Sequence, residues 1–320
     1  AAYAVLPHWK LKHVRDTLHV AYVRMGAVMK AKKLYPTWFA LGALIFYLGL
    51  FFLPGIMGIG YSFTDWNTYS SEVNFVGWKN YLKVFEGGNN YGMYIKNTLL
   101  FTAVSSVTKT TLGIALAVLL TNKMVKMKSM HRMLVFLPQV MSFLIIGLVF
   151  KNILHPSRGF INITLKAIGL DFFAKNWLGD LNFAFKTVFA VDAWKGTGYV
   201  MMVIIAGLNS ISSTYYEAAE LDGAGFFSKF RYVTLPLLKN VIISVTVLNI
   251  TYGFRVFDLI YSLTNGGPGN ATGVINTAVY SEFSKGNYAM GTTLSSILFV
   301  FVLSVSYFIL KAVGNKEVEQ

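Results

Sequence analysis

The chain has 320 residues, of which 55% are hydrophobic and only 13% are charged, and its formal net charge is +14. A soluble domain carries about 25% charged residues, so this composition excludes a disordered chain and an ordinary water-soluble enzyme. The lack of cysteine also excludes a disulfide-stabilised scaffold. In a membrane protein an excess of Lys and Arg indicates cytoplasmic loops and not nucleic-acid binding.

The first 36 residues form a predicted cytoplasmic segment. Its apolar residues Leu11, Val14, Leu18 and Tyr22 recur every three to four positions, which is the spacing of one helical face. Most of its Lys and Arg residues lie off this stripe. We expect a basic amphipathic helix on the cytoplasmic leaflet, the alternative being a solvated basic tail.

Six apolar segments are each long enough to cross a membrane as a helix, which takes about 20 residues. None alternates polar and apolar residues as a strand of a β-barrel does. The sequence therefore predicts an all-α, polytopic membrane protein whose six-span domain covers residues 37–312, followed by a cytoplasmic tail at 313–320. The predicted spans are residues 37–63, 97–120, 133–154, 183–208, 241–263 and 290–310.

Lys and Arg are distributed unequally between the two sides of these spans. The regions before the first span and after the second, fourth and sixth spans hold sixteen of the 28 basic residues, and the three opposite loops hold seven. Because cytoplasmic loops are the basic ones, both termini are predicted to be cytoplasmic.

Several catalytic and cofactor motifs are missing. No Gly-Lys dipeptide occurs, so the chain has no phosphate-binding Walker loop, and the five histidines form no metal-ligand pattern. An intramembrane protease would need paired acids in facing spans, and the acids in the spans are only Asp192 and Asp258. We therefore expect no enzyme activity, no metal and no cofactor in this chain.

The loop between the fourth and fifth spans predicts a short helix outside the membrane. Thr214 and Glu217 have the spacing of a capping box, and two alanines after the glutamate keep the helix surface small. Gly223 and Gly225 are expected to end this helix, and Pro236 to open the next. Such a helix suits docking into a groove on a partner.

This loop resembles the EAA signature of permease subunits of binding-protein-dependent ABC importers. The pattern Glu-Ala-Ala-x-x-x-Gly-x(9)-hydrophobic-x-Leu-Pro is matched from Glu217 to Pro236, although the proline often found a few residues later is absent. The resemblance covers about residues 37–315 and is to the carbohydrate branch, of the maltose-permease type. Its other motifs are at Tyr61–Trp66, Phe75–Tyr81, Phe136–Pro138 and Leu263–Pro268.

The resemblance implies a type I permease fold in the bacterial inner membrane. It implies a heterodimer with a second homologous permease subunit, an ATPase dimer that binds ATP and Mg, an extracytoplasmic solute-binding protein and an oligosaccharide substrate. The coupling loop, about residues 213–239, would enter the ATPase, with Glu217 paired to a basic residue there. The coupling residues that the resemblance implies are Glu217, Ala218, Ala219, Asp222, Gly223, Ala224, Gly225, Leu235 and Pro236.

The resemblance also places a sugar site near the middle of the membrane, on the fourth and fifth spans. Tyrosine faces stack on sugars, while Asn and Asp side chains bind hydroxyls. The alternative is that these polar residues join the helices to one another. The implied substrate-binding residues are Asp192, Gly196, Tyr199, Asn249, Tyr252, Gly253 and Val256.

Charged residues in the same spans suggest an acidic substrate. Lys195 follows Asp192 by three residues, and Asp258 follows Arg255 by three, so mutual neutralisation within each pair is the favoured interpretation. If either cation instead faces the cavity, it could bind a carboxylated sugar such as a uronate or alginate-like oligosaccharide. Lys109, in the second span, is expected to face protein or water, without an assigned role.

Two other function classes stay open from the sequence. An ion-coupled secondary sugar transporter would work without an ATPase, but the two halves show no visible inverted repeat. An intramembrane enzyme is disfavoured because the catalytic constellations are missing.

Overall fold

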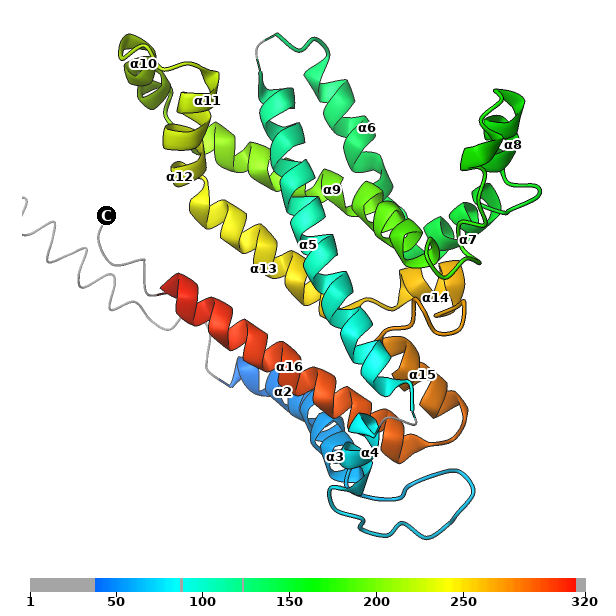
Figure 1. The fold of residues 1–320 in the computed structure, drawn as a ribbon. Helices are drawn as coiled ribbons and strands as arrows, with labels where there is room; N and C mark the ends of the chain where they lie inside the picture. Colours follow the sequence, from blue (N-terminus) through cyan, green and yellow to red (C-terminus); the bar gives the residue numbers. More distant parts are fainter. Residues whose placement is uncertain (1–37, 87–88, 123, 315–320) are drawn as a thin grey trace, which may run out of the picture. The chain divides into compact units, whose positions relative to one another are not determined.

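The computed structural model describes residues 38–86, 89–122 and 124–314. The predicted amphipathic helix and residues 315–320 of the predicted tail lie outside this range. The chain separates into two compact units, residues 1–57 and 58–320. Figure 1 shows the described helices. In the part that the structure describes, the secondary structure is helical throughout, apart from one isolated β-bridge between Thr64 and Phe75.

The first predicted span is a run of apolar helix. It consists of α2 (Phe39–Tyr47), a π-helix (Leu48–Phe52) and α3 (Leu53–Tyr61), of which α3 continues into the second unit. Together these cover 23 residues with a mean hydropathy of 2.1, which is enough to cross a membrane. Since none of its side chains from 39 to 57 is buried, this segment has an apolar surface all round.

The second unit contains the remaining spans and loops. Its short outer helices are α4 (Lys79–Phe85), α8 (Phe160–Ala167), a 3₁₀ turn (Asp171–Phe173) and α15 (Ile275–Ser284). The long helices α5 (Tyr91–Thr121), α9 (Ala184–Ser210) and α16 (Tyr288–Gly314) match the second, fourth and sixth predicted spans. The loop after α9 holds α10 (Ser213–Leu221), α11 (Phe226–Lys229), a π-helix (Phe230–Thr234) and α12 (Leu235–Leu237).

The third and fifth predicted spans are broken, which the hydropathy pattern did not indicate. The third consists of α6 (Lys128–Val140) and α7 (Phe143–Ile153), which meet at an angle of 99°. The fifth consists of α13 (Lys239–Arg255) and a separate helix α14 (Asp258–Thr264). The described helices provide four continuous apolar spans, or six if two bent pairs each count as one span. These pairs are α6 with α7, and the helix Phe226–Leu237 with α13, which meet at 68°.

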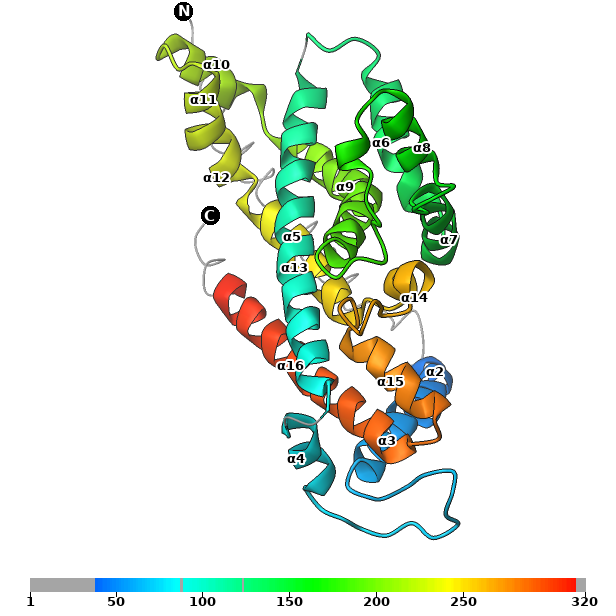
Figure 2. The same ribbon diagram turned by 45° about the vertical axis from the view of Figure 1, so that its right-hand side comes forward.

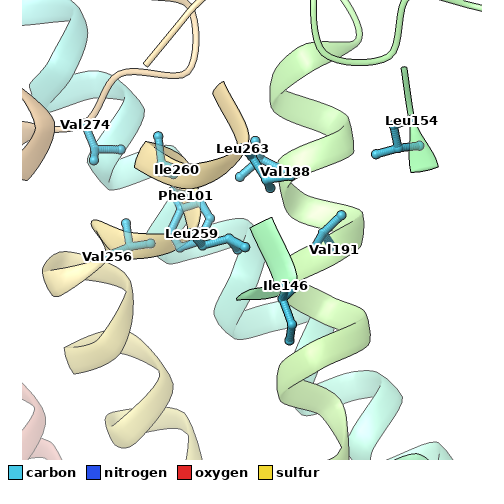
Figure 3. Close-up of a cluster of buried hydrophobic side chains, with 10 residues drawn as sticks. All are labelled: Phe101, Ile146, Leu154, Val188, Val191, Val256, Leu259, Ile260, Leu263 and Val274. Carbon is cyan, nitrogen blue, oxygen red and sulfur yellow. The ribbon is translucent and has the colours of Figure 1, made fainter. Parts of the chain in front are cut away.

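Three helices form the centre of the second unit. In both Figure 1 and Figure 2, α5 crosses α9 and α13, and it packs against each of them. One apolar cluster, drawn in Figure 3, joins Phe101 of α5 and Val191 of α9 to α7 and α14. A second joins Ala117 of α5, Val200 of α9 and Val245 of α13. Polar and charged residues of the same three helices lie between the two clusters, and they form the candidate site.

Candidate functional site

The carboxylate of Asp192 lies at the centre of a buried cluster of polar side chains. Ser105 donates its hydroxyl to Oδ2 of Asp192 at 2.5 Å, and the ammonium of Lys109 lies 3.0 Å from the same oxygen. Tyr252 donates its hydroxyl to Oδ1 at 2.8 Å. The side chains of Lys109 and Asp192 are only 3% and 1% exposed. Three helices, α5, α9 and α13, are thus joined through one carboxylate.

Lys195 lies one turn further along α9 and is 2% exposed. Its Nζ donates to the backbone oxygen of Gln139 at 3.1 Å. This carbonyl belongs to the last turn of α6, where the break before α7 leaves backbone oxygens without helical partners. Lys195 therefore binds the backbone at the break in the third span.

Two aromatic rings connect these lysines. The rings of Phe143 and Tyr252 are stacked, with centroids 5.5 Å apart and an interplanar angle of 18°. Nζ of Lys195 lies 4.0 Å from the centroid of Phe143, and Nζ of Lys109 lies 4.1 Å from that of Tyr252. Both distances are within cation–π range. The cluster thus contains two ammonium groups, two stacked rings and one carboxylate.

A cavity of about 390 Å³ adjoins this cluster. Phe143 and Tyr252 line it, together with the charged side chains of Arg255 and Asp258 at the end of α13 and the start of α14. Nearby, Asn276 donates to the backbone oxygens of Phe254 and Val256. Aromatic faces, one cation and one anion are therefore available to a ligand in this cavity.

The expected pairing within each span is wrong. Asp192 pairs with Lys109 of α5 and not with Lys195, because Ser105 and Tyr252 hold both of its oxygens toward α5 and α13. Among the described residues, Arg255 and Asp258 also form no ion pair, and both are exposed. A spacing of three residues on one helix allows an ion pair, but Asp192 instead pairs with a lysine on a neighbouring helix.

Only some of the implied sugar-binding residues lie around the cluster. Asn249 is buried and its amide donates to the hydroxyl of Thr110 at 3.4 Å, so it joins α13 to α5. Gly253 packs on the backbone of Thr102, where a Cβ would lie 2.7 Å from Cα. Tyr199 is exposed on α9.

Two further positions have a packing role in this structure. Val256 is buried in the apolar cluster of Figure 3. Gly196 leaves room for the side chain of Lys109, because a Cβ there would lie 2.5 Å from Cδ of the lysine. Gly196 therefore supports the site from behind Lys109, whereas Val256 also lines the cavity beside Tyr252 and Arg255.

Lys109, which the sequence analysis left without a role, is the ion-pair partner of Asp192 in the cluster. Lys109 lies in the middle of α5, and the neighbouring polar residues Thr102, Ser105 and Ser106 are also buried. A lysine in an apolar span, preceded by hydroxyl residues at helical spacing, could have indicated this polar face. Nothing in the sequence pairs it with an acid 83 positions away.

The coupling loop is held in a fixed local conformation. The helix α10 ends in a Schellman motif, in which Ala224 N–H bonds to the oxygen of Ala219 and Gly223 N–H to that of Glu220. Gly223 has φ +76, a left-handed conformation that favours glycine. Lys229 forms an ion pair with Glu220 at 2.7 Å, which ties α11 to α10.

Some details of the predicted coupling loop are wrong. Ser212, and not Thr214, is the N-cap of α10, and its hydroxyl accepts from the Thr214 N–H, so the predicted capping box is absent. Gly225 does not end α10, since it has φ −70 and precedes α11. Pro236 does lie in the first turn of α12, as expected.

The implied coupling residues are mostly on the surface of this loop. Exposed apolar side chains accompany them, since Leu221 is 91% exposed, Phe227 is 81% exposed and Tyr232 is 77% exposed. Leu221 lies outside the candidate spans, where an exposed apolar side chain indicates an interaction site, whereas Phe227 and Tyr232 belong to the helix Phe226–Leu237, which forms a bent candidate span with α13. The exposed coupling residues are Glu217, Ala218, Asp222, Gly223, Gly225 and Pro236, and the half-buried ones are Ala219, Ala224 and Leu235.

Comparisons with known proteins agree with this architecture. Residues 109–320 match the family described as "Binding-protein-dependent transport system inner membrane component". The trehalose/maltose transport system permease protein MalF of Thermococcus litoralis is 36% identical over 76% of this chain and 81% of its own length.

Two solved structures share the fold. A bacterial ABC transporter involved in the import of the acidic polysaccharide alginate has a TM-score of 0.74 and 23% identity, over 97% of this chain and 99% of its own. A bacterial alginate ABC transporter in complex with an alginate pentasaccharide-bound periplasmic protein has a TM-score of 0.73 and 24% identity, covering 94% of this chain and 95% of its own. The family match and the identity to MalF together show that this chain belongs to the inner membrane components of binding-protein-dependent transport systems.

Proposed function

We propose that this chain is the permease subunit of an ATP-driven importer of acidic oligosaccharides, such as uronate oligomers. The observation that carries the proposal is an excess of positive charge inside the spans. Lys109 and Lys195 are both buried, and Asp192 is the one buried acid among the described residues of the three central helices. A buried charge in a membrane is costly, and in transporters it marks the substrate path.

The cavity offers the remaining groups that an acidic sugar needs. The rings of Phe143 and Tyr252 provide flat faces for stacking on a sugar. Arg255 is exposed in the cavity and forms no ion pair among the described residues, so its guanidinium is available to a carboxylate. Both helix breaks that border this region, between α6 and α7 and after α13, match the way transporters build sites from interrupted helices.

The comparisons include transporters of both neutral and acidic sugars. MalF of Thermococcus litoralis is named for trehalose and maltose transport, which are neutral sugars. The two alginate transporters share the fold, and one was solved with an oligosaccharide-bound periplasmic protein. The cations at the site favour an acidic sugar, delivered by a binding protein, over a neutral one.

In the proposed transport cycle, a separate ATPase acts on the spans through the coupling loop. A separate ATPase dimer would bind ATP and Mg and move the coupling loop, and the spans would alternate between outward- and inward-facing states. A ligand can drive such a change only if its affinity differs between the two states. We infer that the chain itself makes and breaks no covalent bonds, and that it lies in the inner membrane with both termini in the cytoplasm.

Transport assays test the substrate class. The complete importer, reconstituted in liposomes with the second permease, the ATPase and the binding protein, is expected to accumulate a uronic-acid trisaccharide when ATP is supplied. Uptake restricted to neutral maltodextrins would overturn the acidic substrate. Uptake by this chain alone, driven by a proton gradient, would overturn the ATP-driven mechanism.

The coupling role is tested with Gly223→Asp. The substituted residue would occupy a left-handed conformation in the loop, so the protein is expected to insert and assemble while ATP hydrolysis continues without uptake. Ser228→Asp is the matched control, because it adds the same charge at an exposed helical position of the same loop, outside the implied coupling residues. Normal uptake by the Gly223 variant would contradict the assignment of this loop.

A further inference from the structure

We propose that Lys109 is a specificity-determining contact for a substrate carboxylate, and that Asp192 occupies its place in the unliganded state. This inference rests on the proposed acidic substrate and names the residue that would recognise it. Lys109 was not implied by the family resemblance, and it does not line the cavity in this structure.

The donors around Asp192 make a complete carboxylate site. One oxygen receives the hydroxyl of Ser105 and the ammonium of Lys109, and the other receives the hydroxyl of Tyr252. None of these donors is on α9, the helix that carries Asp192. Rotation of the aspartate side chain would therefore leave an ammonium and two hydroxyls directed at the space that a carboxylate had filled. An ionised carboxylate is the ligand that such donors bind best.

The cavity leads to this carboxylate site through one side chain. Tyr252 lines the cavity and also donates its hydroxyl to Asp192. Its ring lies 4.1 Å from Nζ of Lys109. Tyr252 is therefore a side chain that the cavity and the ammonium of Lys109 share.

Charge balance leaves room for one additional negative group. The buried charged side chains of the described chain are Lys109, Asp192, Lys195 and Glu282, of which Glu282 pairs with Lys285 on α15. The first three leave one positive charge without an acid. A single substrate carboxylate would balance it, whereas a neutral sugar would not.

The displaced aspartate has a second partner within reach. Asp192 and Lys195 are three residues apart on α9, which is contact spacing on a helix. If a substrate carboxylate takes Lys109, Asp192 can turn to Lys195, and both lysines are then paired. Lys195 would leave the oxygen of Gln139 at the break between α6 and α7. Substrate binding would thereby be transmitted to the bend in the third span.

Binding measurements on the assembled complex test this exchange. The probes are a radiolabelled uronic-acid trisaccharide and its neutral methyl ester, measured by equilibrium dialysis against the purified permease pair and ATPase in detergent, without binding protein. For the wild type we expect the acid to bind at least about tenfold more tightly than the ester, as for a charge-assisted contact. For the double variant Lys109→Met/Asp192→Asn, we expect this preference to fall by about tenfold, to whatever part Arg255 contributes.

The double variant separates recognition from structural support. If the Lys109–Asp192 pair only held the helices together, removing both charges would keep the preference for the acid, and this result would overturn the inference. Lys186→Met removes another lysine of α9, outside the cluster, and is expected to keep the wild-type preference. A loss of preference in this control as well would also contradict the assignment. Failure of the wild type to transport the acid in liposomes would instead reject the proposed substrate itself.

Discussion

The polar cluster around Asp192 and the coupling loop differ in which side chains they bury and which they expose. The cluster buries charged side chains, whereas the loop exposes apolar ones. In the cluster, charged side chains are 3% exposed or less, and each has partners from other helices. In the loop, large apolar side chains such as Leu221 and Phe227 are exposed. Burial of charge is costly, and so is exposure of a contiguous apolar surface to water.

The difference between these regions distinguishes two kinds of partner. The cluster satisfies its own charges except for one positive charge, so what it lacks is a small anionic ligand. The loop is held in place by the turn at Gly223 and the ion pair of Glu220 with Lys229, so what it lacks is a surface to cover its apolar side chains. Changes in the cluster should therefore alter stability strongly, and changes in the loop should alter assembly more than stability.

Asp192→Ala should have the strongest effect on stability. It leaves Lys109 buried without its acid, which we expect to lower the free energy of unfolding by about 3–5 kcal/mol. Unfolding by SDS titration in mixed micelles measures this. The double variant Lys109→Met/Asp192→Leu should recover most of the loss, and an equally unstable double variant would contradict the charge-pair explanation.

Gly196→Ala should have the second-largest effect on stability. The new Cβ would overlap Cδ of Lys109, whose ammonium is fixed by Asp192, so the lysine cannot simply move aside. We expect a loss of about 1–3 kcal/mol in the same assay. Gly92→Ala is the matched control, because nothing lies within 4 Å of a Cβ there. Equal behaviour of the two variants would show that Lys109 is not confined.

Lys229→Met in the coupling loop should be nearly neutral for stability. The ion pair with Glu220 is partly exposed, with side chains 22% and 65% exposed, so its loss should cost about 0.2–1 kcal/mol. Co-purification of the ATPase should fall more clearly, since α10 and α11 lose their link. A large fall in stability with intact ATPase binding would contradict the claim that changes in the loop affect assembly more than stability.

The half-buried carboxylate of Asp65 is expected to give the smallest effect on stability. Asp65, in the loop after α3, accepts the backbone N–H of Asn74 at 2.7 Å, and this bond lowers the pKa of Asp65 below its ordinary value. Its contribution is therefore present above the ordinary carboxylate pKa of about 3.9 and is lost as the pH falls through the lowered one. Amide protection of Asn74, corrected for intrinsic exchange, should fall only in that acidic range. The Asp65→Asn variant should not show this step, and a step near neutral pH would contradict the assignment.

Hydropathy predicted much of the fold. Long apolar runs indicated the helices of all six predicted spans, and the assignment of the loop from Glu217 to Pro236 to coupling stays a prediction. The breaks in the third and fifth spans were missed because hydropathy continues through them. Pro138 lies two residues before the end of α6, and Gly253 lies two residues before the end of α13. Glycines also occur inside the unbroken α9, so a glycine alone did not indicate the second break. The partners there, such as Asn276, are distant in sequence.

The candidate site was predicted less well, for a physical reason. Within one helix, spacing identifies neighbours, and it favoured Lys195 as the partner of Asp192. In the folded chain, three donors from two other helices compete for that carboxylate, and Lys195 instead satisfies a backbone oxygen at the end of α6. Which of two nearby lysines binds the acid depends on how the helices pack, and this cannot be read from periodicity.

A structure of the complete importer with a bound uronic-acid trisaccharide would test the exchange at Lys109 most directly. We predict a substrate carboxylate within hydrogen-bond distance of Nζ of Lys109, with Asp192 turned to Lys195. A trisaccharide bound elsewhere, with the pair between Lys109 and Asp192 still intact at 3.0 Å, would contradict it.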